Sequence, residues 1–205
     1  MGHRFLEITG TPSVKAAQAA HGSRAIYAKF DGGAATHDRL GPAEADFIAA
    51  RDSFYLASVS ETGGPYIQHR GGPPGFIQVV DERHLRFPDY RGNRQYITLG
   101  NTAADPRVAL FLMDYPNRSR LKLLGRLSVA DGEDVGTAAR AKVERYLVVE
   151  VEAFDWNCPQ HITPRFTEAE LVEALAPMRQ RLDELEAENA RLRRRLAGNG
   201  EERGS

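Results

Sequence analysis

The amino-acid sequence predicts a mainly β protein: an antiparallel barrel with peripheral helices and a C-terminal coiled-coil helix. Between residues 54 and 153, short runs of alternating apolar residues are joined by tight turns, with few long helices. This pattern favours an antiparallel barrel over a doubly wound parallel sheet. Helical patterns, spaced by three to four residues, precede these runs. A seven-residue repeat of apolar residues follows them, between residues 168 and 196.

The composition limits the classes of function. The chain has 205 residues, with 27 Lys and Arg against 28 Asp and Glu, so no global basic field attracts nucleic acid or an anionic membrane. The single cysteine, Cys158, excludes an internal disulfide framework and fits a reducing compartment. No apolar run approaches the ~20 residues of a membrane span, and the start lacks the apolar region of a secretion signal. We therefore expect a cytoplasmic protein that binds neither nucleic acid nor membranes.

The predicted elements follow in chain order, starting with an N-terminal helical arm over residues 1–40. A helix opens at Pro12 and stops near Gly22, and the Asp-Gly-Gly sequence at 31–33 then breaks the chain. The main domain is expected over residues 41–165. It begins with a second helix, which starts after Pro42 and ends near Asp52.

Strands are predicted wherever the spacing of apolar residues changes to two. A helix is also expected over 93–101, because Tyr96, Ile97 and Leu99 give it an apolar side. The expected strands span residues 54–60, 66–70, 76–80, 84–87, 107–114, 121–129 and 144–153.

The C-terminal segment, residues 167–197, reads as a coiled-coil helix, followed by a disordered tail at 198–205. Asn189 in the a row favours a parallel two-stranded coil, in which Arg181 faces Glu186 of the partner and Glu188 faces Arg193. The alternative is a helix packed on its own barrel. Pro177 weakens the first turn, so the stable coil is expected to start after it. The d positions hold Leu171, Met178, Leu185 and Leu192, and the a positions hold Leu175, Leu182, Asn189 and Leu196.

Two clusters rich in Arg, Gly and Asn come where strand patterns end, at residues 68–72 and 90–94. Glycine lets a backbone approach a ligand closely, and arginine offers a planar fork of donors that suits phosphate oxygens. Two such clusters on neighbouring strands predict a pocket for a phosphorylated small molecule. Two solvated hairpin turns are the alternative reading.

Four segments that include these clusters resemble a known family in their order and spacing. Residues 64–68, 86–94, 105–111 and 120–126 are similar to the pyridoxamine 5'-phosphate oxidase-like, FMN-binding split-barrel superfamily. The resemblance covers about 42–151. Residues 69–76 and 155–162 resemble signature segments of a bacterial flavin-nucleotide-binding branch. The resemblance implies a split barrel of the antiparallel Greek-key type, and a homodimer that holds two FMN molecules at the barrel interface.

The resemblance also implies roles for individual residues. Arg70 falls near the arginine that binds the flavin phosphate, Asn93 and Arg94 fall on the phosphate loop, and Arg91 is a plausible helper. Asn93 would open a helix whose N–H groups add donors. Arg120 falls where the family has a glutamine that reaches the flavin, and Trp156 would close the site across the interface. The full set of implied cofactor-binding residues is Gln68, His69, Arg70, Tyr90, Arg91, Asn93, Arg94, Arg120, Trp156, Asn157 and His161.

The sequence departs from the true oxidases at its end, where Asn157-Cys158-Pro159-Gln160-His161 follows Trp156 in place of Arg-Leu-x-Pro. Oxidation of pyridoxamine phosphate is therefore not expected. His69 and His161 read either as flavin contacts or as structural histidines. A zinc site at Cys158 and His161 is not expected, because no second ligand pair accompanies them.

The expected function is an oxidoreductase that passes electrons from NADH or NADPH to a small-molecule acceptor, with no catalytic residue identified. A non-catalytic flavin-binding or sensor module is one alternative to this reading. A relative that binds F420 or haem is the other.

Overall fold

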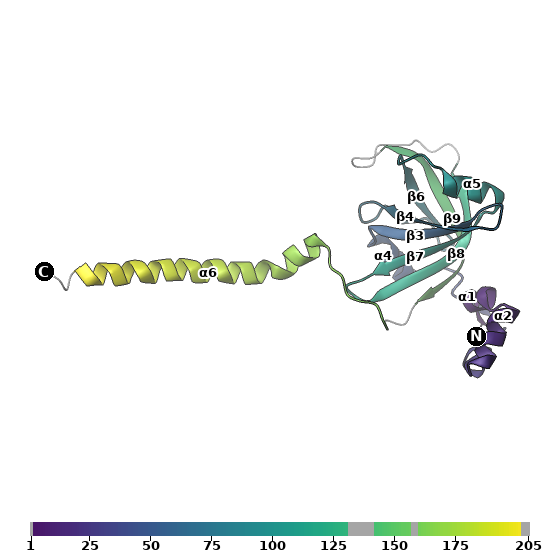
Figure 1. Cartoon of the computed structure of the whole chain (residues 1–205), viewed down its shortest axis with the longest axis horizontal. Coiled ribbons are helices and arrows are strands. Elements are labelled where there is room, and N and C mark those ends of the chain that lie inside the picture. The colour runs from purple at the N-terminus through teal and green to yellow at the C-terminus, as the bar shows by residue number, and fades with distance from the viewer. Residues whose placement is uncertain (1, 131–141, 157–159, 202–205) are drawn as a thin grey trace. The chain divides into compact units, whose positions relative to one another are not determined.

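The computed structural model describes residues 2–130, 142–156 and 160–201 of the chain. The chain divides into two compact units, Met1–Ile162 and Thr163–Ser205. The first unit contains the sheet and the shorter helices, and the second contains one long helix, α6 (Figure 1).

The first unit is built on a seven-stranded sheet in which every neighbouring pair is antiparallel. The strand order is β4-β3-β7-β8-β9-β6-β5. This confirms the expected antiparallel organisation. The shortest strand, β5, covers only two residues of the predicted run at 76–80, whereas β6 and β9 extend beyond the predicted bounds. The strands are β3 (Ser53–Val59), β4 (Pro65–Gly71), β5 (Gln78–Val79), β6 (His84–Tyr90), β7 (Arg107–Asp114), β8 (Ser119–Val129) and β9 (Val143–Trp156).

The sheet curls around its own core without closing into a hydrogen-bonded barrel. β4 and β5 are its edges, and no ladder joins them in the described parts of the chain. Phe54 on β3 and Phe87 on β6 are separated in the sheet by three strands, yet their ring centroids lie 4.9 Å apart. The alternating residues of β3, β7 and β8 that point inward are buried, including Leu56, Leu110 and Leu123. The described residues thus form an open, curled sheet, and closure of the expected split barrel is not shown.

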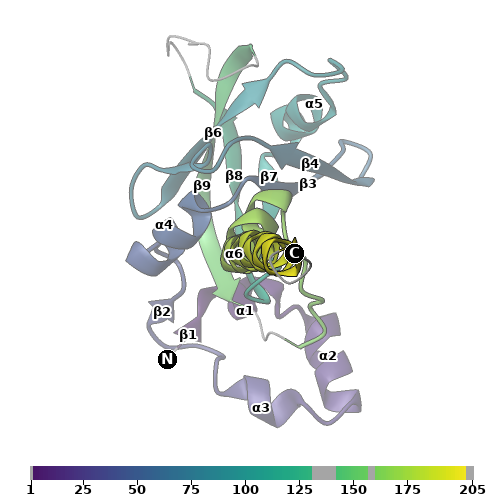
Figure 2. The same cartoon turned by 90° about the vertical axis from the view of Figure 1, so that its left-hand side faces the viewer.

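The predicted helices at Pro12 and Pro42 are confirmed as α2 and α4, and proline occupies the first turn of each. The spacing of apolar residues did not predict α1, α3 or the short parallel pair of β1 (Gly2–His3) and β2 (Ala35–Thr36). Figures 1 and 2 show α5 and the N-terminal helices at opposite ends of the sheet. The helices of this unit are α1 (Arg4–Thr9), α2 (Pro12–Ala20), α3 (Arg24–Ala28), α4 (Pro42–Ala49) and α5 (Ile97–Ala104).

Two histidines of the N-terminal segment stack on each other beside the end of β9. The rings of His3 and His37 lie 3.9 Å apart and nearly parallel, and His3 Nε2 lies 3.4 Å from Asp155 Oδ1. Asp155 also pairs with Lys122, with 2.6 Å between Nζ and Oδ2. Burial lowers the pKa of His3 below its ordinary 6.5 and His37 lowers it further, although Asp155 opposes both effects.

We expect this cluster to make stability depend on pH. As the pH falls below about 6.5, the unfolded chain takes up the His3 proton before the folded chain does, so the free energy of unfolding decreases. The contribution is complete above that pH and is lost as the pH falls through the lower pKa of the folded state. Urea unfolding from about pH 5 to about pH 8 measures it, and His3→Gln should flatten the profile. His21→Gln, which removes an exposed histidine, should keep the wild-type profile. Equal slopes for wild type and His3→Gln would contradict this reading.

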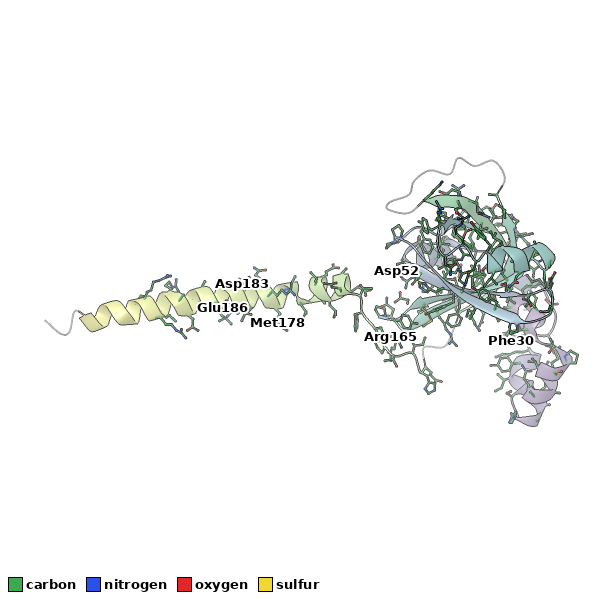
Figure 3. The ribbon with its side chains drawn as sticks, turned by 45° about the horizontal axis from the view of Figure 1, so that its top comes forward. Phe30, Asp52, Arg165, Met178, Asp183 and Glu186 are labelled. Atoms are coloured by element: carbon green, nitrogen blue, oxygen red, sulfur yellow. The ribbon has the colours of Figure 1, made fainter. Side chains whose placement is uncertain are left out.

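The second unit is formed by α6 (Glu168–Glu201), which continues without a break through Pro177. Figure 3 shows the labelled side chains of Met178, Asp183 and Glu186 projecting outward from this helix. The structure of the single chain confirms the predicted helix. The pairing of this helix in a coiled coil stays a prediction. Among the described residues, no helix combines the length and apolar content that a membrane span requires.

Candidate functional site

A pocket opens between β4, the connection from β6 to α5, and the beginning of β9. Residues 66, 68 and 70 of β4, residues 89, 90 and 92–99, and Glu144 of β9 line it. Its enclosed volume is about 60 Å³. Both arginine-rich clusters of the sequence therefore contribute to one site. The prediction placed them on neighbouring strands, but β4 and β6 are not neighbours in the sheet.

The alternation of β4 decides which residues of the first cluster reach the pocket. Successive side chains of a strand point to opposite faces, so Gln68 and Arg70 share the pocket face. His69 lies on the other face, where it is exposed and its ring meets Tyr55 edge-on at 5.6 Å. Gln68 is held in place by Thr98 of α5, whose Oγ1 donates to Gln68 Oε1 at 2.8 Å.

Arg70 is bound to a buried carboxylate at the base of the pocket. Its Nη1 lies 2.5 Å from Asp89 Oδ1, and the two side chains are only 12% and 10% exposed. Arg145 approaches the other oxygen of Asp89, with 3.5 Å between Nε and Oδ2. Arg70 Nε is buried and finds no acceptor among the described residues. Arg70 is thus a positioned donor whose charge is already shared with Asp89.

A β-bulge aims Glu144 into the pocket. Asp89 pairs with Arg145 and Tyr90 pairs with Val143, which leaves Glu144 as the extra residue of β9. Bulges of this kind redirect a side chain and are common beside functional sites. Glu144 Oε2 accepts from the Tyr96 hydroxyl at 3.1 Å and from Arg145 Nη2 at 3.1 Å.

The second cluster forms an irregular turn above these residues. Arg94 and Tyr96 both adopt left-handed backbone angles, with φ of 61° and 52°, which is uncommon for residues other than glycine. Arg94 Nε donates to the Tyr96 hydroxyl at 3.4 Å, and this contact raises the pKa of Arg94. Arg91 Nε lies 3.9 Å from Glu144 Oε1. Both arginines are exposed and remain charged.

The expectation that Asn93 opens a helix is wrong. Asn93 Oδ1 accepts from the N–H of Gln95 at 3.2 Å, a local turn contact, and α5 begins at Ile97. Tyr96 occupies the N-cap position and offers no side-chain hydrogen bond to the first turn. Because residues 97–99 line the pocket, the N-terminal end of α5 still faces the site.

The charges around the pocket leave a positive excess. Among the described residues, Arg70 and Arg94 line the pocket with Asp89 and Glu144. Arg91 and Arg145 lie beside it, within ion-pair distance of these carboxylates, so four positive charges meet two negative ones. Burial raises the pKa of Tyr90, so its hydroxyl stays neutral near pH 7 and can donate a hydrogen bond. This group of donors can bind an anion that carries about two charges.

Several predicted residues lie elsewhere. Arg120 is on β8 opposite Met113, with its guanidinium 5.3 Å from the ring centre of Phe111. Trp156 donates from Nε1 to Glu44 Oε1 at 2.7 Å and packs on Phe47 of α4.

His161 is exposed in a turn with a φ of 64°. Asn157 and Cys158 lie outside the described residues. The cofactor roles assigned to Arg120, Trp156, Asn157 and His161 therefore remain predictions.

The sequence reading missed Glu144, Arg145 and Tyr96 as members of the site. One signal could have found two of them: adjacent charges at 144 and 145 open a strand that is otherwise largely apolar. The bulge that turns Glu144 inward depends on pairing with β6, so no local pattern reports it.

Comparisons with known proteins place these observations in context. Residues 40–182 match the family model described as pyridoxamine 5'-phosphate oxidase. No curated protein matches the sequence.

Solved structures with a similar fold include HupZ from Group A Streptococcus, which is 12% identical. That match covers 62% of this chain and 99% of HupZ, with a TM-score of 0.45. An FMN-binding protein from Syntrophomonas wolfei is 11% identical, with coverage of 55% and 81% and a TM-score of 0.42. HutZ, the haem storage protein from Vibrio cholerae, is 12% identical, with coverage of 57% and 94% and a TM-score of 0.37.

Proposed function

Because the chain belongs to the pyridoxamine 5'-phosphate oxidase family, we propose that it is an FMN-binding oxidoreductase. In this proposal it passes electrons from NADH or NADPH to a small-molecule acceptor. The family includes flavin-dependent oxidoreductases and often binds FMN. The observation that carries the proposal is the positive excess around a pocket that both arginine-rich clusters help to line, to which Arg91 and Arg145 contribute from beside it.

The donors in the pocket suit the phosphate of FMN. A phosphate monoester carries about −1.5 to −2 charges at pH 7, which matches the excess of two positive charges. Arg91 and Arg94 are exposed and can turn toward such a group, and Arg70 Nε is a buried donor that lacks an acceptor. The first turn of α5 adds N–H groups without a side-chain cap. Bound FMN would supply the redox chemistry, and the protein would orient it and control access.

The flavin ring needs more surface than one chain encloses. Small-molecule pockets usually measure roughly 300–1,000 Å³, against about 60 Å³ here. The outer face of the sheet next to the pocket is apolar, and Tyr55, Ile67 and Phe111 lie on it. Ile67 is 64% exposed, between Tyr66 and Gln68 that line the pocket. Large exposed apolar patches mark interaction surfaces. A homodimer formed through this face therefore belongs to the proposal, with each flavin bound by both subunits.

Phosphate recognition is tested by titrating the purified protein with FMN and with riboflavin, which lacks the phosphate. Riboflavin should bind at least about tenfold more weakly, because hydrogen bonds to a charged group contribute about 1.5–3 kcal/mol each. Replacing Arg91 and Arg94 together with alanine should weaken FMN binding by about 10–100-fold and leave riboflavin binding unchanged. Arg107→Ala is the matched control, since Arg107 is an exposed arginine paired with Asp105 outside the pocket. Equal affinities for FMN and riboflavin would contradict the assignment of this pocket as the phosphate site.

The same preparation separates the candidate functions. Oxidised-flavin absorption bands that bleach rapidly with NADH or NADPH and return with an acceptor would support the enzyme. Bound flavin that neither NADH nor NADPH reduces would favour the non-catalytic module. A Soret band, or binding of F420 in preference to FMN, would overturn FMN as the cofactor.

A further inference from the structure

Helix α6 carries a stripe of exposed apolar side chains, which we call the leucine stripe. Its first five members are spaced alternately by four and three residues and the sixth follows after seven, so all of them share one face of the helix. Met178 is 70% exposed, and the other members are between 39% and 56% exposed. Exposed apolar surface of this extent indicates an interaction site. The stripe consists of Leu171, Leu175, Met178, Leu182, Leu185 and Leu192.

We propose that the leucine stripe pairs with the same stripe of a second copy of this chain, in parallel and in register. The stripe takes two positions in seven, which is the width of a coiled-coil seam. A helix that packs on a globular surface usually needs a wider apolar face. The partner of the stripe is therefore another helix with a narrow apolar face. The polar residues of α6 indicate that this partner is α6 of a second copy of the chain.

Asn189 selects the parallel, in-register arrangement. It interrupts the a row between Leu182 and Leu196 and shares a surface groove with Leu185 and Arg193. In a parallel pair in register, Asn189 meets the partner's Asn189 and the two amides can bond to each other. In an antiparallel pair an a residue faces a d residue, so the amide would be buried against an apolar side chain without a partner.

The charges beside the stripe agree with this arrangement. Arg181 at g faces the partner's Glu186 at e, and Glu188 at g faces the partner's Arg193 at e, so the two flanks attract. Within one helix, Arg181 Nη1 lies 3.0 Å from Glu184 Oε2. Arg191 Nη2 likewise lies 3.8 Å from Glu188 Oε1. Exposed ion pairs within one helix contribute little to stability. Losing them therefore costs little when the same side chains pair across two helices.

Charge reversal in the full-length chain tests both orientation and register. One variant, R181E/E188R, and a second, E186R/R193E, each place like charges opposite each other in a parallel homodimer. When the two are mixed, every g–e contact becomes attractive. The two variants have the same composition and mass, so one of them is labelled with heavy nitrogen. Native mass spectrometry of the mixture should then show heterodimers in at least about tenfold excess over random pairing. Pairing through the sheet face alone gives random mixing, so this result does not depend on the proposed flavin function.

Two further variants show that the excess comes from the stripe. Adding Leu182→Glu and Leu185→Glu to both charge-reversed chains should abolish the heterodimer excess. Gln180→Glu, placed on the same helix away from the stripe, should preserve it. Random mixing of the two charge-reversed chains overturns the proposal. Survival of the excess without Leu182 and Leu185 overturns it as well.

Discussion

Replacing Phe87 with alanine should lower the free energy of unfolding by about 3–5 kcal/mol, the range for deleting a fully buried phenylalanine ring. Phe87 is 0% exposed, and its ring meets Phe54 edge-on at 4.9 Å. The Arg70 guanidinium lies over the same ring, with 6.0 Å between its Cζ and the Phe87 ring centroid. The cavity left by the alanine would thus lie where β3 packs against β6, next to Arg70 of the pocket.

Chemical denaturation followed by circular dichroism measures this effect. Phe166→Ala is the matched control, because Phe166 is exposed and surface substitutions usually change stability by less than about 0.5 kcal/mol. Phe87→Leu, which keeps most of the apolar volume, should cost clearly less than alanine. A loss below about 1 kcal/mol for Phe87→Ala would show that this contact does not hold the curl of the sheet.

Replacing Arg70 with methionine should cost about 3 kcal/mol, because removing one partner of a buried ion pair leaves an uncompensated charge. Asp89 would remain buried with Arg145 alone, 3.5 Å away. The double variant Arg70→Met/Asp89→Asn should be more stable than Arg70→Met, since it removes that charge. Urea unfolding of the four proteins in the cycle gives the coupling between the two residues.

Arg39→Met serves as the control for this cycle. Arg39 pairs with Glu82, and both side chains are more than half exposed, so the loss should stay below about 1 kcal/mol. If Asp89→Asn fails to recover stability in the double variant, the buried charge is not the cause of the loss. Arg91 and Arg94 are therefore cleaner probes of phosphate binding, because replacing Arg70 would change the stability of the fold and the site together.

The elements that the sequence predicted well are those with strong local signals. Alternating apolar residues identified β3, β7 and β8 almost to their ends, and proline marked the starts of α2 and α4. The start of α5 was predicted four residues too early, at Asn93. Apolar spacing through Tyr96 and Ile97 suits a helix, but the left-handed backbone of Arg94 and Tyr96 interrupts it.

The candidate site was predictable only in part. The two clusters indicated that their arginines share one pocket, but the implied set also included His69, which β4 places on the face opposite Gln68 and Arg70. The partnership of Arg70 with Asp89 was not foreseen. It joins two residues on strands that are not neighbours in the sheet, and neither residue's own surroundings in the sequence indicate it.

Local spacing and composition were enough to indicate most of the strands, the heptad pattern of α6 and the two arginine-rich clusters, because each depends on a few adjacent residues. Long-range contacts set how the sheet curls, which arginines pair with carboxylates and where Glu144 points. Those outcomes depend on contacts between strands far apart in the chain, and side-chain periodicity carries no information about such distances.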